Sequence, residues 1–312
     1  MDDYHLITSK EIHDAVAYLL RYLPPKMHVV IISRQKIPFS LSSFRIRNQI
    51  TEVVASDLKL TEIESERFLS EIMTVSLTSE QIKELTRYAE GWIGGLQMIA
   101  LSLRGKDNLN DLKDILASAG RITAEYLIDE VLKVQPEEVR EFIFHTVLLN
   151  KFNAELCEHV TGMKNTAEIL DYLYQANLFL IPLNSEYTWY RYHNLFSESL
   201  GTRISNSPVK GPSEIHRSAA LWFAKNNYLE DAFRHAFATN DYEFAADMLE
   251  EYLYHFFDRY DVANALRWIS KLPHPILMQR TLLRLDECTF KVLSQQLGEL
   301  EAVLHEIEGQ KE

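Results

Sequence analysis

Residues 179–192 have the sequence Phe179-Leu180-Ile181-Pro182-Leu183-Asn184-Ser185-Glu186-Tyr187-Thr188-Trp189-Tyr190-Arg191-Tyr192. Two runs rich in aromatic and apolar residues flank the polar turn Asn184-Ser185-Glu186, a pattern typical of a β-hairpin. Three short stretches with helical spacing precede this hairpin, near 137–149, 154–161 and 166–176. Three helices followed by a β-ribbon predict a winged-helix domain over residues 136–207.

The composition is that of a helical, globular protein. The chain has 312 residues, enough for two or three domains, and is 46% hydrophobic and 25% charged. Its 10 glycines and 9 prolines are few, which favours helices over sandwiches. Two cysteines make no disulfide framework, and the chain shows neither a secretory leader nor an apolar run of membrane-spanning length. We therefore expect a cytoplasmic protein without contact to a membrane.

The charge pattern argues against direct binding to DNA. The formal net charge is −13, whereas nucleic-acid binding normally requires a basic surface. The third helix of the predicted winged helix, 166–176, contains Glu168 and Asp171 but no Lys or Arg. A helix that enters a DNA groove needs basic residues to neutralise phosphates, so we expect this helix to pack internally.

The first 56 residues predict a partial α/β domain. The run His28-Val29-Val30-Ile31-Ile32-Ser33 and residues 50–54 are rich in β-branched residues, typical of strands buried on both faces of a parallel sheet. A helix is expected over 11–22, ended by Pro24-Pro25. The chain starts Met1-Asp2-Asp3, and P-loop ATPases place two acidic residues at the end of a strand beside Mg²⁺ and the attacking water. No GxxxxGK[ST] loop, which would hold the phosphates, occurs in the sequence.

The rest of the chain predicts helices. Residues 57–135 show helix starts at Thr61 and Thr78, and a helical pattern over 81–103 that is interrupted by glycines. A polar linker, 205–208, precedes residues 208–312, where small residues recur at positions expected for helix crossings. This spacing suggests tetratricopeptide-like helical repeats, although no clean 34-residue period is present.

Four strings together resemble the MalT-like, LuxR-type large ATP-binding transcription regulators of the STAND class of signalling NTPases. They are Asp2-Asp3-Tyr4-His5, Ile32-Ser33-Arg34, the run from Glu90 to Leu103, and Trp189-Tyr190-Arg191-Tyr192-His193-Asn194-Leu195-Phe196. The resemblance covers nearly the whole chain. It implies a mainly α protein with a partial P-loop NTPase-like core (1–56), a helical lid (57–135), a winged helix (136–207) and the start of a helical-repeat sensor (208–312). Compared with the family, the P-loop half and the C-terminal DNA-binding helix-turn-helix are missing, so we expect a fragment truncated at both ends.

The resemblance also assigns candidate site residues. Asp2 and Asp3 correspond to the carboxylate beside Mg²⁺ and the carboxylate that orients the water, with Asp2 as the metal ligand; two solvated acids at a chain terminus are the alternative. Arg34 corresponds to a sensor of the terminal phosphate, or it pairs with a local acid. His193 corresponds to a contact with the nucleotide β-phosphate, whereas a structural histidine is the other interpretation.

The run Gly91–Gln97 allows two interpretations. It either borders the adenine, as in related NTPases, or it is a close helix crossing that glycine makes possible. Related proteins often have proline where this chain has Gln97, so packing is the favoured role.

We expect no enzyme activity. ATP and Mg²⁺ serve the intact family, but this chain lacks the loop that would hold them, and no metal-binding motif such as HExxH is present. The segment 211–312 has 10 basic and 17 acidic residues, a net charge of −7, together with many aromatic residues. Part of that surface is expected to bind a small-molecule inducer, a protein partner or a second copy.

The leading hypothesis is therefore a fragment of an ATP-dependent, signal-responsive transcription regulator. The alternative is a helical-repeat adaptor that binds proteins without nucleotide control. A third possibility, an active ATPase, requires a phosphate-binding loop supplied by another chain.

Overall fold

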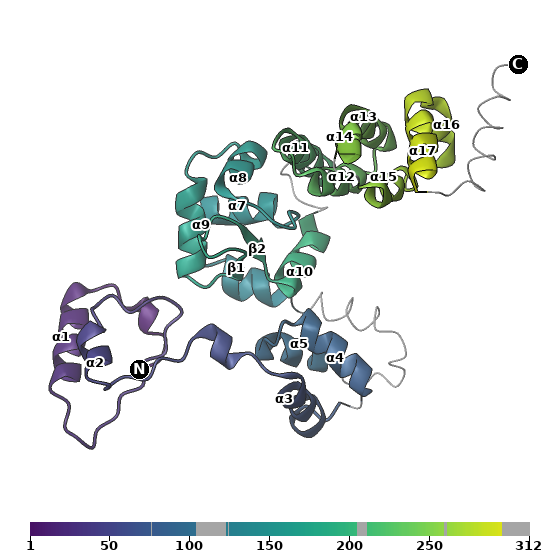
Figure 1. The fold of residues 1–312 in the computed structure, drawn as a ribbon. Helices are drawn as coiled ribbons and strands as arrows, with labels where there is room; N and C mark the ends of the chain where they lie inside the picture. The colour runs from purple at the N-terminus through teal and green to yellow at the C-terminus, as the bar shows by residue number, and fades with distance from the viewer. Residues whose placement is uncertain (76, 104–122, 124, 205–210, 259–260, 295–312) are drawn as a thin grey trace, which may run out of the picture. The chain divides into compact units, whose positions relative to one another are not determined.

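The computed structural model describes the chain except residues 76, 104–122, 124, 205–210, 259–260 and 295–312 (Figure 1). The described part is mainly helical, as expected, with one two-stranded sheet. It forms two compact units. The first comprises 1–143, 150–154 and 165–203, and the second 144–149, 155–164 and 204–312. Among the described residues, no helix has the length and apolarity that crossing a membrane would require.

The amino-terminal segment contains a 3₁₀ turn, Tyr4–Leu6, and two helices, α1 (Lys10–Arg21) and α2 (Ser42–Ile46). Helix α1 confirms the helix predicted over 11–22. It begins where the Ser9 side chain accepts a hydrogen bond from the backbone N–H of Ile12, a typical N-cap. None of its residues is buried, although its sequence is amphipathic.

The strands predicted at 28–33 and 50–54 are wrong as assigned, because neither segment is a strand in the described structure. Residues 30–32 instead run alongside the amino terminus. The Met1 amino group donates to Val30 O (2.8 Å), Ile32 N to Met1 O (2.9 Å) and Tyr4 N to Ile32 O (3.0 Å). Both segments run in the same direction, and α1 lies between them in the sequence.

The same two segments are exposed where burial was expected. The side chains of Val30 and Ile32 are 69% and 58% exposed, and Val53 and Val54 are exposed as well. The physical reason is that the described residues provide neither a further strand beside 30–32 nor a helix over its faces. Three hydrogen bonds to one neighbour do not make a sheet.

The next segment is a small helical bundle. It contains a 3₁₀ turn (Ala55–Leu58), α3 (Glu62–Arg67) with a π-helical turn (Phe68–Ile72), α4 (Ser79–Tyr88) and α5 (Ile93–Leu103). Thr61 with Glu64, and Thr78 with Gln81, form capping boxes, which confirms both predicted helix starts. The bundle packs around a core of fully buried residues: Leu69, Leu85, Ala89, Leu96, Ile99 and Leu195. A π-helical turn, Leu127–Leu132, follows the residues that are not described.

The elements of the winged helix occur in the predicted order. They are α7 (Glu137–Thr146), α8 (Ala154–Thr161), α9 (Thr166–Gln175), β1 (Leu180–Pro182), β2 (Tyr190–Tyr192) and α10 (Asn194–Ile204). The strands are antiparallel, with Ile181 opposite Arg191, and an isolated bridge joins Phe152 to Tyr190.

Both strands are shorter than predicted. The Asn184 side chain accepts hydrogen bonds from Thr188 N and Trp189 N, and Phe179 and Tyr187 adopt left-handed backbone conformations (φ 57° and 54°). These turn-forming interactions end the regular pairing early.

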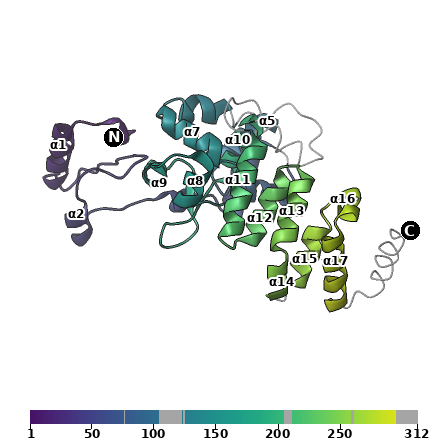
Figure 2. The ribbon, with the colours of Figure 1, turned by 90° about the horizontal axis from the view of Figure 1, so that it is seen from above.

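The carboxy-terminal segment is a series of helices: α11 (Pro212–Lys225), α12 (Leu229–Ala238), α13 (Tyr242–Tyr252), α14 (Tyr254–Asp258), α15 (Val262–Ile269), α16 (His274–Gln279) and α17 (Thr281–Leu293). Helix α12 packs on both α11 and α13 (Figures 1 and 2). Fully buried alanines at these crossings, including Ala232, Ala236 and Ala245, let the helices approach closely, as the small residues predicted. The predicted linker at 205–208 lies outside the described residues.

Candidate functional site

The turn that connects α4 to α5 contains two consecutive residues with positive φ. Glu90 and Gly91 both adopt positive φ (47° and 73°), which reverses the chain after α4. The N–H of Gly91 donates to Thr86 O, and its carbonyl accepts from Leu60 N at 2.9 Å. A Cβ at Gly91 would lie 2.8 Å from Leu60 O, so only glycine fits. The turn therefore joins the beginning of the helical bundle to α5.

Glu90 reaches from this turn to the β-hairpin. Arg191 donates to both carboxylate oxygens of Glu90, Nη1 to Oε1 at 2.7 Å and Nη2 to Oε2 at 2.9 Å, across 101 residues of sequence. The backbone N–H of Asn194 also donates to Oε1, at 2.9 Å. The Glu90 side chain is 11% exposed and that of Arg191 is 29% exposed. We call this arrangement the Glu90–Arg191 clamp.

The clamp determines the charge state of Glu90. Burial alone raises the pKa of its carboxyl group, but the hydrogen bonds from Arg191 and from Asn194 N outweigh burial, so the pKa lies below its ordinary value. The hydrogen bond to Glu90 raises the pKa of Arg191 in return. Glu90 is therefore ionised at neutral pH. A charge-assisted hydrogen bond of this kind contributes roughly 1.5–3 kcal/mol, and the solvent exposure of Arg191 places the clamp toward the lower end.

Trp92 packs behind the clamp against the hairpin. Its ring centroid lies 5.2 Å from that of Phe179 and 6.0 Å from that of His193. Two glycines make room for it: a Cβ at Gly94 or at Gly95 would lie 2.9 Å from the Trp92 ring. A Cβ at Gly95 would also approach Leu195 to 3.0 Å. These contacts support the packing interpretation of the run Gly91–Gln97, in which Gln97 itself is exposed.

His193 is buried next to the clamp, and the Ala89 carbonyl is near its ring without regular hydrogen-bond geometry. It is 7% exposed, and neither ring nitrogen makes a regular hydrogen bond within the described part of the chain. Burial, and then the charges of Lys59 and Arg191, lower its pKa, while the Glu90 carboxylate and the Ala89 carbonyl oppose this shift. An unmatched buried nitrogen costs about 1–3 kcal/mol relative to one in water. Burial of His193 therefore makes an unfavourable contribution to the free energy of the packed hairpin and turn.

The other predicted site residues are Asp2, Asp3 and Arg34. All three are exposed. His5 connects two of them, because its Nδ1 accepts from Arg34 N at 3.4 Å and lies 4.0 Å from Asp3 Oδ1. The carbonyl oxygen of Arg34 accepts a hydrogen bond from the side chain of Asn177.

His5 was not predicted as part of this group, and its place directly after Asp2-Asp3-Tyr4 was the only available signal. Its ring contacts the backbone of Arg34 rather than the guanidinium. The roles of Asp2, Asp3 and Arg34 toward a nucleotide, and of Asp2 toward Mg²⁺, remain predictions.

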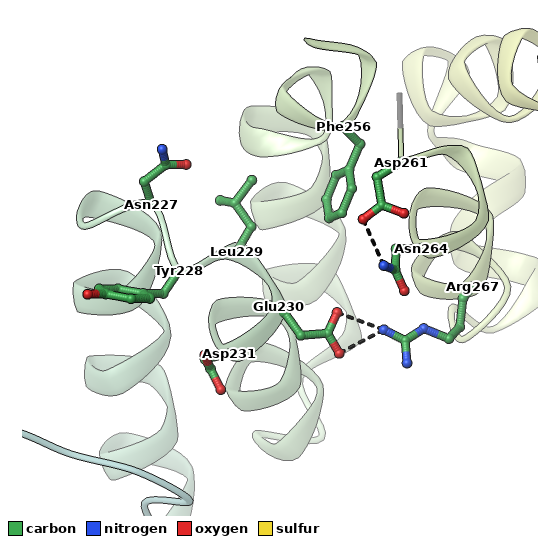
Figure 3. A pocket seen from close by; sticks show the side chains of 9 residues that line it. All are labelled: Asn227, Tyr228, Leu229, Glu230, Asp231, Phe256, Asp261, Asn264 and Arg267. Atoms are coloured by element: carbon green, nitrogen blue, oxygen red, sulfur yellow. Dashed lines mark hydrogen bonds and ion pairs between the residues drawn. The ribbon is translucent and has the colours of Figure 1, made fainter. Parts of the chain in front are cut away.

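A hollow lies in the helical series, between the first turns of α12 and α15 and the side chain of Phe256 (Figure 3). Its volume is about 500 Å³. Its three carboxylates already have partners. Glu230 accepts from Arg267 and Trp268, Asp231 pairs with Arg234, and Asp261 accepts from Asn264. Because these charges are matched internally, the clamp with its unmatched histidine is the stronger candidate for a functional site.

Comparison with known proteins agrees with this architecture. Residues 128–210 match the family described as the MalT winged helix domain. The chain is 28% identical over 281 residues to the HTH-type transcriptional regulator MalT of Vibrio parahaemolyticus, covering 89% of this chain and 31% of that protein. It is 30% identical over 294 residues to MalT of Klebsiella pneumoniae (91% and 33%), and 28% identical over 311 residues to MalT of Yersinia pestis (99% and 34%). The predicted resemblance is confirmed, and the chain spans about a third of the length of these relatives.

Proposed function

We propose that this chain, which resembles MalT-type regulators over nearly its whole length, is the switch portion of a signal-responsive transcription regulator of the LuxR-type STAND class. In this proposal the partial ATPase-like core, the lid, the winged helix and the first helical repeats transmit a signal to a DNA-binding module elsewhere. The Glu90–Arg191 clamp is the observation that carries it, since it connects the lid to the winged-helix hairpin, where a switch needs a coupling contact.

We further propose that this chain by itself does not hold ATP. Asp2, Asp3 and Arg34 would be remnants of the site that binds Mg·ATP in the family, and no GxxxxGK[ST] loop is present to hold the phosphates. The third helix of the winged helix carries Glu168 and Asp171 and no basic residue, which supports a role in packing rather than in DNA binding. The cytoplasm is the proposed location.

Calorimetry with Mg·ATP tests this proposal. We expect no binding heat at nucleotide concentrations up to about 1 mM. A Kd of 1 mM corresponds to a binding free energy of only about −4 kcal/mol, and we expect the remaining contacts to provide less than this. A Kd in the micromolar range would contradict the proposal that this chain does not bind ATP. ADP without Mg²⁺ is the matched control, since it tests for the base and β-phosphate contacts alone.

The helical-repeat adaptor remains the second candidate, and the exposed residues Val30 and Ile32 distinguish the two. As a portion of a larger core, the chain should associate through this uncovered edge as its concentration increases. The substitution Val30→Lys should abolish that association. A stand-alone adaptor should sediment as a monomer that unfolds cooperatively, with or without the substitution.

A further inference from the structure

We propose that the Glu90–Arg191 clamp is a releasable latch, which holds the lid against the winged-helix hairpin and opens locally without unfolding either part. This inference rests on the proposed function and deepens it, because it names the contact on which regulation acts. The inference is based on three features of one site. The Glu90–Arg191 hydrogen bonds hold the site together, whereas the backbone of Glu90 and the buried ring of His193 are unfavourable in it and would be relieved by opening.

The attraction is concentrated in one side chain. Three hydrogen bonds end on the Glu90 carboxylate, two from Arg191 and one from the backbone of Asn194. The guanidinium and carboxylate meet in the two-pronged geometry that is specific for this pair of groups. Loss of the Glu90 carboxylate would therefore remove all three of these hydrogen bonds at once.

The first unfavourable feature is the backbone of Glu90. Its φ of 47° lies in the left-handed region, where a side chain with a Cβ is strained. Gly91, the next residue, tolerates its own positive φ because it has no Cβ. Backbone hydrogen bonds such as Gly91 N to Thr86 O also hold this turn, and release of the carboxylate would remove one of the contacts that keep Glu90 in its strained conformation.

The second unfavourable feature is His193. Its two ring nitrogens are buried without regular partners, directly beside the Trp92 ring. Separation of the hairpin from the turn would expose both nitrogens to water, which satisfies them. The partial exposure of Arg191 gives water a path to the latch, so that opening can begin there.

Hydrogen exchange of the full chain, followed by mass spectrometry, tests the latch. In Arg191→Ala we expect peptides covering 89–95 and 177–195 to exchange about tenfold faster or more, as local opening predicts. Three amides should report it: Trp92 N, which donates to Ala89 O, His193 N, which donates to Phe179 O, and Asn194 N. Peptides from the centres of α4 and α12 should keep their rates.

A matched control is available in the helical series. Arg267 makes an equivalent ion pair with Glu230 at 2.7 Å, so Arg267→Ala should leave the peptides at 89–95 and 177–195 unchanged. Arg191→Lys, which keeps the charge without the two-pronged geometry, should give a smaller effect at the same peptides, and it serves if Arg191→Ala does not fold.

Two results would overturn the latch. One is unchanged exchange at the junction in both Arg191 variants; the other is uniformly faster exchange throughout the lid and winged helix, which indicates a merely structural role. Neither result depends on nucleotide. The latch and the proposed loss of ATP binding can therefore fail independently.

Discussion

Nδ1 of His216 lies 2.8 Å from Nδ1 of His235, so that two imidazole rings from the neighbouring helices α11 and α12 share one proton. One Nδ1 must donate and the other accept, so at least the accepting ring is neutral. His235 is 2% exposed and also stacks on Phe223. Protonation of the accepting ring would place two N–H groups against each other in the contact between the two helices.

This geometry predicts that the helical series loses stability in mild acid. Burial, followed by the charges of His216 and Arg234, lowers the pKa of His235 to about 3, and burial lowers that of His216. A lowered histidine pKa means that stability is complete above about pH 6.5 and falls as the pH decreases below it. From pH 7.5 to 5, His235 alone should reduce the free energy of unfolding by about 2 kcal/mol.

Urea unfolding followed by circular dichroism at both pH values checks this. The substitution His216→Gln should change the pH dependence, whereas His274→Gln, at an exposed position, should not. A wild-type stability that is equal at pH 7.5 and pH 5 would contradict the prediction.

A second prediction concerns Gly91. Gly91→Ala combines an unfavourable φ with a clash of the new Cβ against Leu60 O, and should reduce stability by about 2–3 kcal/mol. Gly162 has a similar φ of 79°, but no atom lies within 4 Å of the place a Cβ would occupy, so Gly162→Ala should cost only about 1 kcal/mol. Thermal unfolding of both variants measures the difference. Equal losses would show that the contact with Leu60 is not tight.

A third prediction concerns Arg280, which pairs with three carboxylates of α13: Glu243 at 2.5 Å, Asp247 at 2.6 Å and Glu250 at 3.1 Å. Arg280→Ala would leave these three negative charges without their shared partner. We expect a loss of about 1–2 kcal/mol in the free energy of unfolding, most of which should disappear in 1 M salt. Arg45 makes a single exposed ion pair with Glu52, so Arg45→Ala should change stability much less than Arg280→Ala.

A fourth prediction concerns His193. Because neither ring nitrogen has a partner at regular hydrogen-bond geometry, His193→Leu removes a desolvation penalty while filling a similar volume between Trp92 and Phe179. We expect stability to increase by about 1 kcal/mol in chemical unfolding at pH 7. A loss of similar size would instead indicate that the imidazole has a polar partner in solution.

Local sequence patterns predicted the helices well. Helix α1, the helices of the winged helix and the starts of α3 and α4 follow from apolar spacing and from capping residues such as Ser9 and Thr78. These signals act over a few residues, so they do not depend on the rest of the fold. The β-branched run at 28–33 was misleading, because a run of this kind forms a regular strand only where neighbours pair with it on the remaining edge and cover its faces.

The candidate site could be predicted only in part. His193 and the glycines of the α4–α5 turn were identified, but the clamp was not, because Glu90 and Arg191 are separated by 101 residues and no periodicity relates them. His5 was missed for a similar reason, since its contact with Arg34 arises from the parallel arrangement of 1–4 and 30–32. Three-dimensional proximity of single polar residues leaves no pattern in one sequence.

The long separation between Glu90 and Arg191 also has a kinetic consequence. Contacts distant in sequence form late, because the intervening chain loses much conformational entropy when its ends meet. We expect helices α4 and α5 and the hairpin to form before Arg191 binds Glu90. Weakening the Glu90–Arg191 ion pair should therefore increase the unfolding rate constant and leave the refolding rate constant nearly unchanged.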